Sequence, residues 1–226
     1  MAEAVLRRGR RRAVEKMAVT AAEYAAMGWP VCVGAYPPAL HQHRRLQRPS
    51  ELLRACSCDR VGCPAPGAHP VSAAWQVEAT ADPAIVMHWW MAQPEANVIL
   101  ATGRVFDVLD VPSDAGVAAL TMMERSAIQP GPVAVSTGNR ALFFVATRGR
   151  PADEGEWWSC HLDCEPETVS DVAGLRWHCR DSYVLAPPSV DSSAQQAHWL
   201  RPPDGRPLPD GIRLLGFLAD ACESAA

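Results

Sequence analysis

The stretch NVILATGRVFDVLDVP occupies residues 97–112 and is rich in apolar residues. Two apolar runs, Asn97–Ala101 and Val105–Val111, are joined by the turn Thr102-Gly103-Arg104. Apolar runs of this length on either side of a glycine turn predict two successive strands. The second run carries two acidic residues, Asp107 and Asp110.

Helices and further strands are predicted on both sides of this stretch. The apolar spacing indicates helices over Val14–Met27, from Pro83, over 114–126 and over Gly211–Cys222. We expect the second of these helices to turn four side chains inward, Ile85, Val86, Trp89 and Trp90, and the third to bury Ala118, Leu120 and Met123. The remaining strands are predicted at Val31–Ala35, Val133–Ser136, Ala141–Ala146 and Tyr183–Ala186. Strands interleaved with helices predict an α+β fold with a mixed sheet.

Charge is distributed unevenly along the 226 residues. Residues 1–16 contain six basic and two acidic side chains, which leaves 15 basic and 23 acidic ones in the rest of the chain. We therefore predict a flexible basic arm over 1–13 and one domain over 14–226, whose acidic body matches a phosphate backbone poorly. No apolar run of about 18 residues and no signal peptide is present, so a cytoplasmic protein without membrane contact is expected.

Three cysteines and a histidine lie within fourteen residues, as Cys56-x-Cys58-x4-Cys63-x5-His69. Four such donors on a short loop rich in Gly and Pro can surround a zinc ion, and with all four positions filled by protein no site for a reactive water remains. We predict a structural zinc in a loop of about residues 50–72. The alternative is free loop cysteines beside an ordinary surface histidine.

A second group of similar residues is less regular, comprising Cys160, His161, Cys164, His178 and Cys179. Three tryptophans flank it, Trp157, Trp158 and Trp177, so a second metal and a buried aromatic patch both remain open. A cysteine nucleophile with a histidine base has no supporting motif around these residues.

Short motifs follow one another in a characteristic order between Ala21 and Ser189. They are Ala25-x2-Gly28-Trp29, Pro66-Gly67-Ala68-His69-Pro70, Trp75, Ala79-Thr80, Trp89-Trp90, Asn97, Thr102-Gly103, Val108-Leu109-Asp110-Val111, Ser136-Thr137-Gly138, Phe143-Phe144 and Tyr183-Val184-Leu185-Ala186-Pro187-Pro188-Ser189. In this order they resemble the N-terminal domain of bifunctional DNA primase/polymerases, a branch of the archaeo-eukaryotic primase group. The resemblance implies an RRM-type sheet flanked by helices beside a small subdomain, with a nucleotide site between them.

The resemblance also implies a catalytic metal site on the acidic strand. Family members hold Mg²⁺ or Mn²⁺ with two carboxylates at i and i+2, which face the same side of a strand. The first falls on Asp110, but the second position is Pro112. Asp107 is the nearest substitute and could join Asp110 only through a bulge. Asp114 is a further candidate from the segment that follows.

Two more family positions differ in this chain. The expected histidine aligns with Ala141 and a later acidic residue aligns with Arg176. The phosphate-binding turn is better preserved, because Ser136, Thr137, Gly138 and Arg140 offer hydroxyls, backbone N–H groups and a guanidinium. The alternative is an ordinary hairpin turn.

Three hypotheses follow for the function. The first is a catalytically impaired primase/polymerase-like domain, a pseudoenzyme of DNA replication that binds nucleotides or single-stranded DNA. The second is an active nucleotidyltransferase that uses Mg²⁺ or Mn²⁺. The third is an unrelated interaction protein stabilised by zinc. Because no room for a helicase remains after the domain, we expect any helicase or replication partner to be a separate chain.

Overall fold

The computed structural model describes residues 16–37, 56–58, 60, 62–147, 167–168, 172–193 and 195–225. The chain divides into two compact units. The first unit is Met1–Leu100 with Pro188–Gln196, and the second is Ala101–Pro187 with Ala197–Ala226. The predicted basic arm over 1–13 lies outside the described residues, and the single domain over 14–226 stays a prediction.

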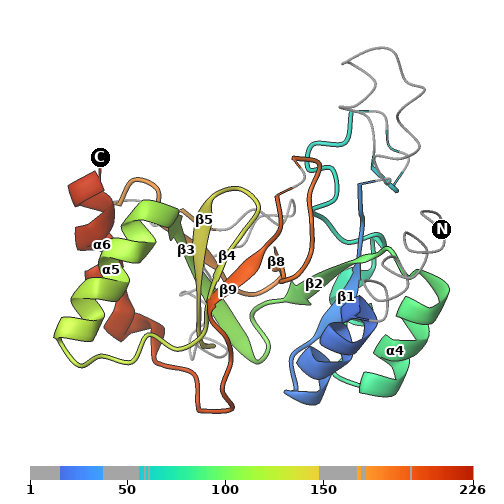
Figure 1. The fold of residues 1–226 in the computed structure, drawn as a ribbon, viewed down its shortest axis with the longest axis horizontal. Coiled ribbons are helices and arrows are strands. Elements are labelled where there is room, and N and C mark those ends of the chain that lie inside the picture. The colour runs from blue at the N-terminus through green and yellow to red at the C-terminus, as the bar shows by residue number, and fades with distance from the viewer. Residues whose placement is uncertain are drawn as a thin grey trace, which may run out of the picture. The chain divides into compact units, whose positions relative to one another are not determined.

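The first unit begins with a helix over residues 16–26, which ends before Gly28 as predicted. Strand β1 (Val31–Gly34) follows and pairs antiparallel with β2 (Asn97–Ala101). In the sequence, α3 (Trp75–Glu78) and α4 (Pro83–Ala92) come between these two strands, and α4 contacts β1 (Figure 1). The chain enters α4 through Asp82, whose Oδ1 accepts hydrogen bonds from the first backbone amides of the helix. This cap and the proline in the first turn fix the start of the helix where the sequence predicts it.

Only part of the predicted apolar face of α4 is buried. Val86 and Trp90 are buried, and the Trp90 indole donates to the Ala96 carbonyl. Trp89 is partly exposed, and Ile85 is 44% exposed, so the prediction of an inward Ile85 was wrong. Residues four apart share a helix face, and only the 86–90 pair faces the core.

The second unit is built on a six-stranded sheet with the order β6-β7-β3-β5-β4-β9. The strands are β3 (Phe106–Pro112), β4 (Val133–Val135), β5 (Arg140–Ala146), β6 (Glu167–Thr168), β7 (Arg176–His178) and β9 (His198–Arg201); β8 (Tyr183–Leu185) also follows in the chain. Each pair of neighbouring strands in this sheet is antiparallel. The α+β class is confirmed, but the mixed sheet was wrong, and the RRM-type label stays a prediction.

Helices α5 (Ser113–Arg125) and α6 (Gly211–Ala225) cover one face of this sheet (Figure 1). The core between sheet and helices includes Leu109, Val111, Ala141, Phe143, Val145 and Trp177 from the strands, and Ala115, Ala119, Met123, Leu214 and Leu218 from the helices. Met123 is buried as predicted and Leu120 is partly buried, but Ala118 is exposed because its neighbour Ala119 faces the sheet.

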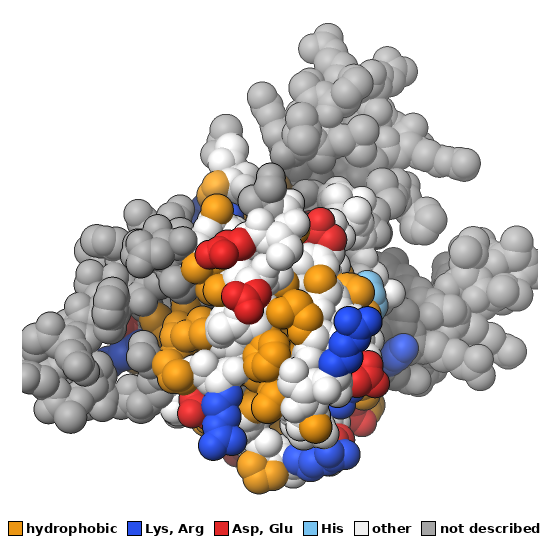
Figure 2. Space-filling model, turned by 90° about the vertical axis from the view of Figure 1, so that its left-hand side faces the viewer, with side chains coloured by type: hydrophobic (Ala, Val, Ile, Leu, Met, Phe, Trp, Pro, Cys, Tyr) orange, Lys and Arg blue, Asp and Glu red, His pale blue; other side chains and the backbone are white. Residues whose placement is uncertain are grey.

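Glycine 116 lets α5 approach β5 closely. A Cβ added there would overlap the Cβ of Ala141 on β5. On the outer side of the helices, Val117 and Ile212 are about half exposed, and Figure 2 shows hydrophobic side chains gathered on this face among acidic and basic ones.

Among the described residues, no helix combines the length and the apolar character that crossing a bilayer requires.

Candidate functional site

The predicted metal ligands of the first unit lie together. The ligand atoms of Cys56, Cys58, Cys63 and His69 are all within 4.8 Å of one another, and this is the only group of three or more potential ligands among the described residues. His69 Nε2 lies 3.4 Å from Cys56 Sγ and 3.3 Å from Cys63 Sγ. A tetrahedral zinc with its usual bond lengths separates such atoms by roughly 3.6 Å. The Cys₃His cluster therefore fits a metal such as zinc.

Backbone contacts aim these ligands at a common point. His69 Nδ1 lies 2.7 Å from the Pro70 carbonyl, which as acceptor leaves the Nε2 lone pair facing the thiols. The Gly67 amide donates to Cys56 Sγ over 3.4 Å. The Ala35 amide, which follows β1, donates to the His69 carbonyl. This hydrogen bond holds the end of the loop beside β1.

The thiols differ in acidity before any metal binds. Burial raises the pKa of the Cys63 thiol to about 11. Burial acts in the same direction on Cys58, but hydrogen bonds from the Arg60 amide and from the thiols of Cys56 and Cys63 outweigh it, so the pKa of Cys58 is lowered. A bound cation would favour the thiolate form of each ligand.

A buried amide connects this loop to a distant part of the same unit. Asn97 is 2% exposed, and its Nδ2 donates to the carbonyls of Gly67 and Val190 over 2.7 and 2.6 Å. Its Oδ1 accepts from the Val190 amide, and the Ser189 hydroxyl accepts from the Val98 amide. The sequence motifs around Asn97 and Pro188-Ser189 thus have a structural role. They join β2, the loop that carries the Cys₃His cluster and the segment 188–192.

The two acidic residues of β3 face opposite sides of the sheet in the second unit. The register between β3 and β5 runs without interruption from Phe106↔Ala146 to Pro112↔Arg140, so no bulge brings Asp107 round to Asp110. Asp107 is 2% exposed on the helix-covered face, where the Trp177 indole donates to its Oδ2. The structure does not bring the predicted catalytic pair together.

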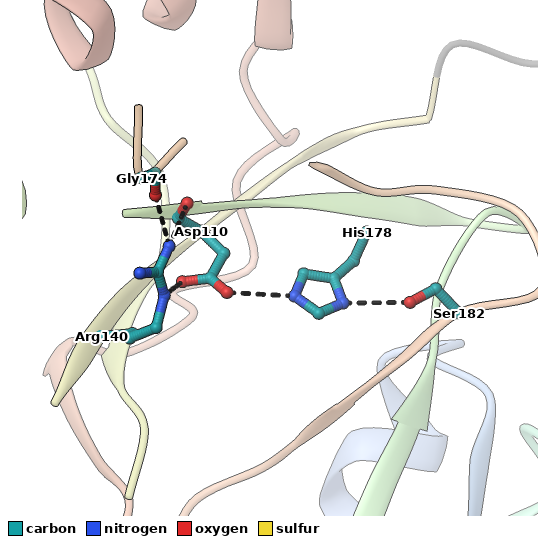
Figure 3. Close-up of polar contacts among 5 residues, drawn as sticks. All are labelled: Asp110, Arg140, Gly174, His178 and Ser182. Carbon is teal, nitrogen blue, oxygen red and sulfur yellow. Dashed lines mark hydrogen bonds and ion pairs between the residues drawn. The ribbon is translucent and has the colours of Figure 1, made fainter. Parts of the chain in front are cut away.

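Asp110 is held by a guanidinium on the other face (Figure 3). Arg140 Nε donates to Asp110 Oδ1 over 2.5 Å, and Nη2 donates to the carbonyls of Asp110 and Gly174 over 3.0 and 2.5 Å. The two side chains are only 18% and 6% exposed, so the ion pair is shielded from water. Arg140, predicted to hold phosphate, is engaged here with the predicted metal ligand.

The second carboxylate oxygen of Asp110 also has a partner. His178 Nε2 lies 3.3 Å from Asp110 Oδ2, and His178 Nδ1 lies 3.0 Å from the Ser182 hydroxyl (Figure 3). Ser182 is fully buried. His178 therefore belongs to this chain of contacts, while Cys160, His161 and Cys164 of the predicted second group lie outside the described residues.

The other predicted candidates are dispersed around this group. Ala141 is buried on the helix-covered face, opposite to Asp110, whereas Arg176 is exposed and pairs with Asp110 across β3 and β7. Asp114 is exposed in the first turn of α5, where its Oδ1 contacts the Ala115 amide. The face around Asp110 thus carries Arg140, Arg176 and His178, and its local charge is positive rather than acidic.

The predicted phosphate-binding turn joins β4 to β5. The Ser136 amide donates to the Arg140 carbonyl, and the Asn139 amide donates to the Ser136 carbonyl. Asn139 has a φ of 55°, which asparagine tolerates in tight turns. Thr137 is 8% exposed and Gly138 is exposed, so the turn presents polar backbone at the end of the strand pair.

Sequence reasoning missed two members of the Asp110 group. The sequence places His178 in a possible metal site and contains no signal for Ser182. The signal that links them is strand register, because Val108 pairs with His178 and lies two residues from Asp110 on the same face. That register is not readable from the sequence, where β7 is a three-residue strand.

The family model for the N-terminal domain of bifunctional DNA primase/polymerases matches residues 21–211. The chain belongs to this family. Membership in this family supports a DNA primase/polymerase-like function. It suggests activity of the nucleotidyltransferase type and implies interaction with nucleic acid or nucleotides. A comparison with curated proteins found no match.

Proposed function

We propose that this Prim-Pol domain is catalytically impaired and serves as a module that binds nucleotides without transferring them. The observation that carries the proposal is the contact between Arg140 and Asp110. The acid at the family's metal position is bonded to a cation that the chain itself supplies. A divalent metal at Asp110 would have to displace this guanidinium.

The rest of the group supports the same conclusion. The i+2 partner is Pro112, which cannot ligate a metal, and Asp107 lies on the opposite face. Both oxygens of Asp110 already have partners, in Arg140 and His178. Two-metal catalysis of phosphoryl transfer stabilises charge on the attacking and leaving oxygens, and a single occupied carboxylate supplies little of the required ligand set.

Nucleotide binding in this proposal uses the turn between β4 and β5. Ser136 and Thr137 offer hydroxyls, and the backbone around Gly138 offers N–H groups, which together suit a phosphate. Arg176 adds an exposed guanidinium on the Asp110 face.

Zinc in the Cys₃His cluster is the structural part of the proposal. The four ligands complete a tetrahedron, which leaves no position for substrate. When bound, the ion would hold the two ends of the loop together. Magnesium or manganese would be required only if catalysis survives.

The test combines an activity assay with a binding assay. The unmodified protein is incubated with a primer-template, each dNTP, and Mg²⁺ or Mn²⁺, and no extension above that of Asp110→Ala is expected. Calorimetry with dATP in buffer free of divalent cations should nevertheless show binding, which Thr137→Val weakens. Robust extension that disappears in Asp110→Ala would establish the active enzyme instead.

Single-stranded DNA is tested in parallel. If the basic arm contacts phosphates, DNA binding falls steeply with salt and is lost when residues 1–12 are deleted. The same deletion should leave dATP binding unchanged, because the proposed phosphate contacts come from residues 136–138.

A further inference from the structure

The exposed residues of 113–125 and 211–225 form one outer surface of the second unit, the α5–α6 face. Val117 and Ile212 are 53% and 51% exposed on it. Figure 2 shows hydrophobic side chains across the middle of this face, with acidic side chains above them and most of the basic ones below. The position of each charge along the face follows from the directions of the two helices.

Helices α5 and α6 run in opposite directions along the sheet (Figure 1). The first begins directly after the end of β3. The second begins near the start of β3, because a Cβ on Gly211 would lie 3.1 Å from Val145, which pairs with Asp107. Burial raises the pKa of the Cys222 thiol, and the nearby Asp114 carboxylate acts in the same direction. Cys222 on α6 and Asp114 on α5 therefore lie at about the same level of the helix pair.

The six charged residues of the two helices are all exposed, and they are sorted along the helix pair. The half nearer the start of α5 carries three acidic side chains, Asp114, Asp220 and Glu223. The half nearer the start of α6 carries two arginines and one acid, Arg125, Arg213 and Glu124. The face is therefore acidic at one end and contains both of its basic residues at the other.

The stability of α6 does not account for the charges that it carries. A helix dipole favours acidic residues in the first turn and basic residues in the last. Helix α5 follows this rule, with Asp114 in its first turn and Arg125 in its last. Helix α6 reverses it, because Arg213 lies in the first turn and Glu223 in the last. These two charges suit opposite charges outside the helix better than the helix itself.

Opposite charges share one stripe on each helix. On α5, Asp114 and Arg125 are close to three whole turns apart, so both face the same way. On α6, Arg213 and Asp220 are close to two whole turns apart and likewise share a stripe. Turning either helix end for end about the midpoint of its pair exchanges the acid and the base. A second copy of the face, turned in this way, presents a base to each acid and an acid to each base.

The two midpoints lie at one level of the helix pair. The midpoint on α5 follows Ala119, and the midpoint on α6 follows Gly216. Asp114 and Cys222, which are level with one another, each lie five to six residues from the midpoint on their own helix. One two-fold axis can therefore cross both helices and exchange both pairs. Gly216 is exposed beside this axis, and a Cβ there would meet nothing within 4 Å, which leaves room for a neighbouring helix.

We propose that the α5–α6 face is a dimer interface, on which a second copy of this chain packs across a two-fold axis. In the dimer, Arg213 of each copy faces Asp220 of the other, and Asp114 of each copy faces Arg125 of the other. Such an interface is self-complementary, because every contact occurs twice. The opposite charges set the register and reject the arrangement in which the helices of the two copies run the same way.

The size of the face indicates a weak dimer. Helices of 13 and 15 residues that pack side by side present a face about 20 Å long and about 20 Å wide, on the order of 400 Å² per copy. Interfaces of this size belong to transient complexes. The population of the dimer should therefore depend on protein concentration.

The test reverses one charge at a time and then mixes the variants. Sedimentation equilibrium of the full chain loaded with zinc measures the dissociation constant of the dimer. Arg213→Glu and Asp220→Arg should each raise this constant by about tenfold or more, because each variant places like charges together in both halves of the interface. An equimolar mixture of the two variants should recover the dimer, because every contact in the mixed dimer joins an acid to a base.

Lys16→Glu is the matched control, because it makes the same change of charge at an exposed position of the first unit and should leave the dissociation constant unchanged. Both α6 variants place charges that the dipole of α6 favours, so the melting temperature of the monomer should not fall. Thermal melting at low protein concentration checks that both variants fold.

Three results would overturn the proposed interface. A chain that stays monomeric up to about 1 mM would leave the α5–α6 face to a different protein. Dimers that withstand both charge reversals would be held by another surface. Dimers that are lost in both variants and do not return on mixing would rule out the two-fold pairing. None of these results bears on nucleotide binding at residues 136–138, so the proposed function is tested separately.

Discussion

Arg140 Nε lies 2.5 Å from Asp110 Oδ1, and the same guanidinium donates to the main-chain carbonyls of Asp110 and Gly174. One side chain thus joins β3, β5 and the segment before β7. The guanidinium supplies the positive charge that an acidic residue at this position of the sheet requires. The pair is therefore a stabilising contact. It is also the reason that we infer that no catalytic metal binds at Asp110.

Arg140→Met should lower the free energy of unfolding by about 3 kcal/mol, because it leaves the Asp110 carboxylate buried without its cation. The double variant Asp110→Asn with Arg140→Met should recover part of this loss. Urea unfolding measures both. The exposed pair Arg206–Asp204, with side chains 70% and 50% exposed, is the control, and Arg206→Met should change stability by less than about 1 kcal/mol. Equal effects at the two arginines would contradict a buried ion pair.

Removing a metal ligand should release zinc from the first unit. Cys63→Ser is expected to reduce the zinc content, measured by elemental analysis, by about one equivalent per chain. Hydrogen exchange should then accelerate over residues 62–71 more than in the sheet of the second unit, because the loop depends on the metal for order. Cys179→Ser serves as control, since Cys179 is also partly exposed but lies outside the cluster. Full zinc occupancy in Cys63→Ser would refute the assignment.

Asn97→Ala should destabilise the first unit by about 2–4 kcal/mol, because the Gly67 and Val190 carbonyls lose their donor. Amide exchange at Val190 and Ser192 should accelerate, since these amides donate to Asn97 Oδ1 and the Pro66 carbonyl. Gln195→Ala, at an exposed side chain in the same segment, is the comparison. Unchanged exchange at Val190 would show that the amide does not hold the segment.

Gly116→Ala should destabilise the second unit by about 1–3 kcal/mol, because the new Cβ overlaps that of Ala141. Combining it with Ala141→Gly removes the opposing atom, and a double-mutant cycle should show positive coupling between the two sites. Gly216→Ala in α6 is the matched control. A Cβ there meets nothing within 4 Å, so this variant should be neutral or stabilise by up to about 1 kcal/mol.

The strands with strong apolar patterns were predictable from sequence, and so was the helix that Asp82 caps. Asn97–Ala101 agrees with β2, and Val105–Val111 lies within one residue of β3. Strands β7 and β9 were missed, because three or four residues of mixed polarity have no readable period. Their existence depends on long-range pairing, which local sequence does not encode.

The Cys₃His cluster was predictable because its four residues are close in sequence, and their spacing limits the geometry. The group around Asp110 was not predictable from sequence. Its members are residues 110, 140, 178 and 182, which are far apart in the chain and come together only through strand register. Alternation along β3 did predict that Asp107 and Asp110 face opposite sides. The residues that contact the Asp110 carboxylate could be identified only from the structure.

The close approach at Gly116 limits the size of the side chain that β5 can hold at position 141. Any residue larger than alanine at position 141 meets α5 at the glycine, and that position is buried against the helix. A histidine there, which the resemblance in sequence predicts, would require α5 to shift or β5 to change register. The packing of α5 on the sheet therefore decides which residue this strand position can carry.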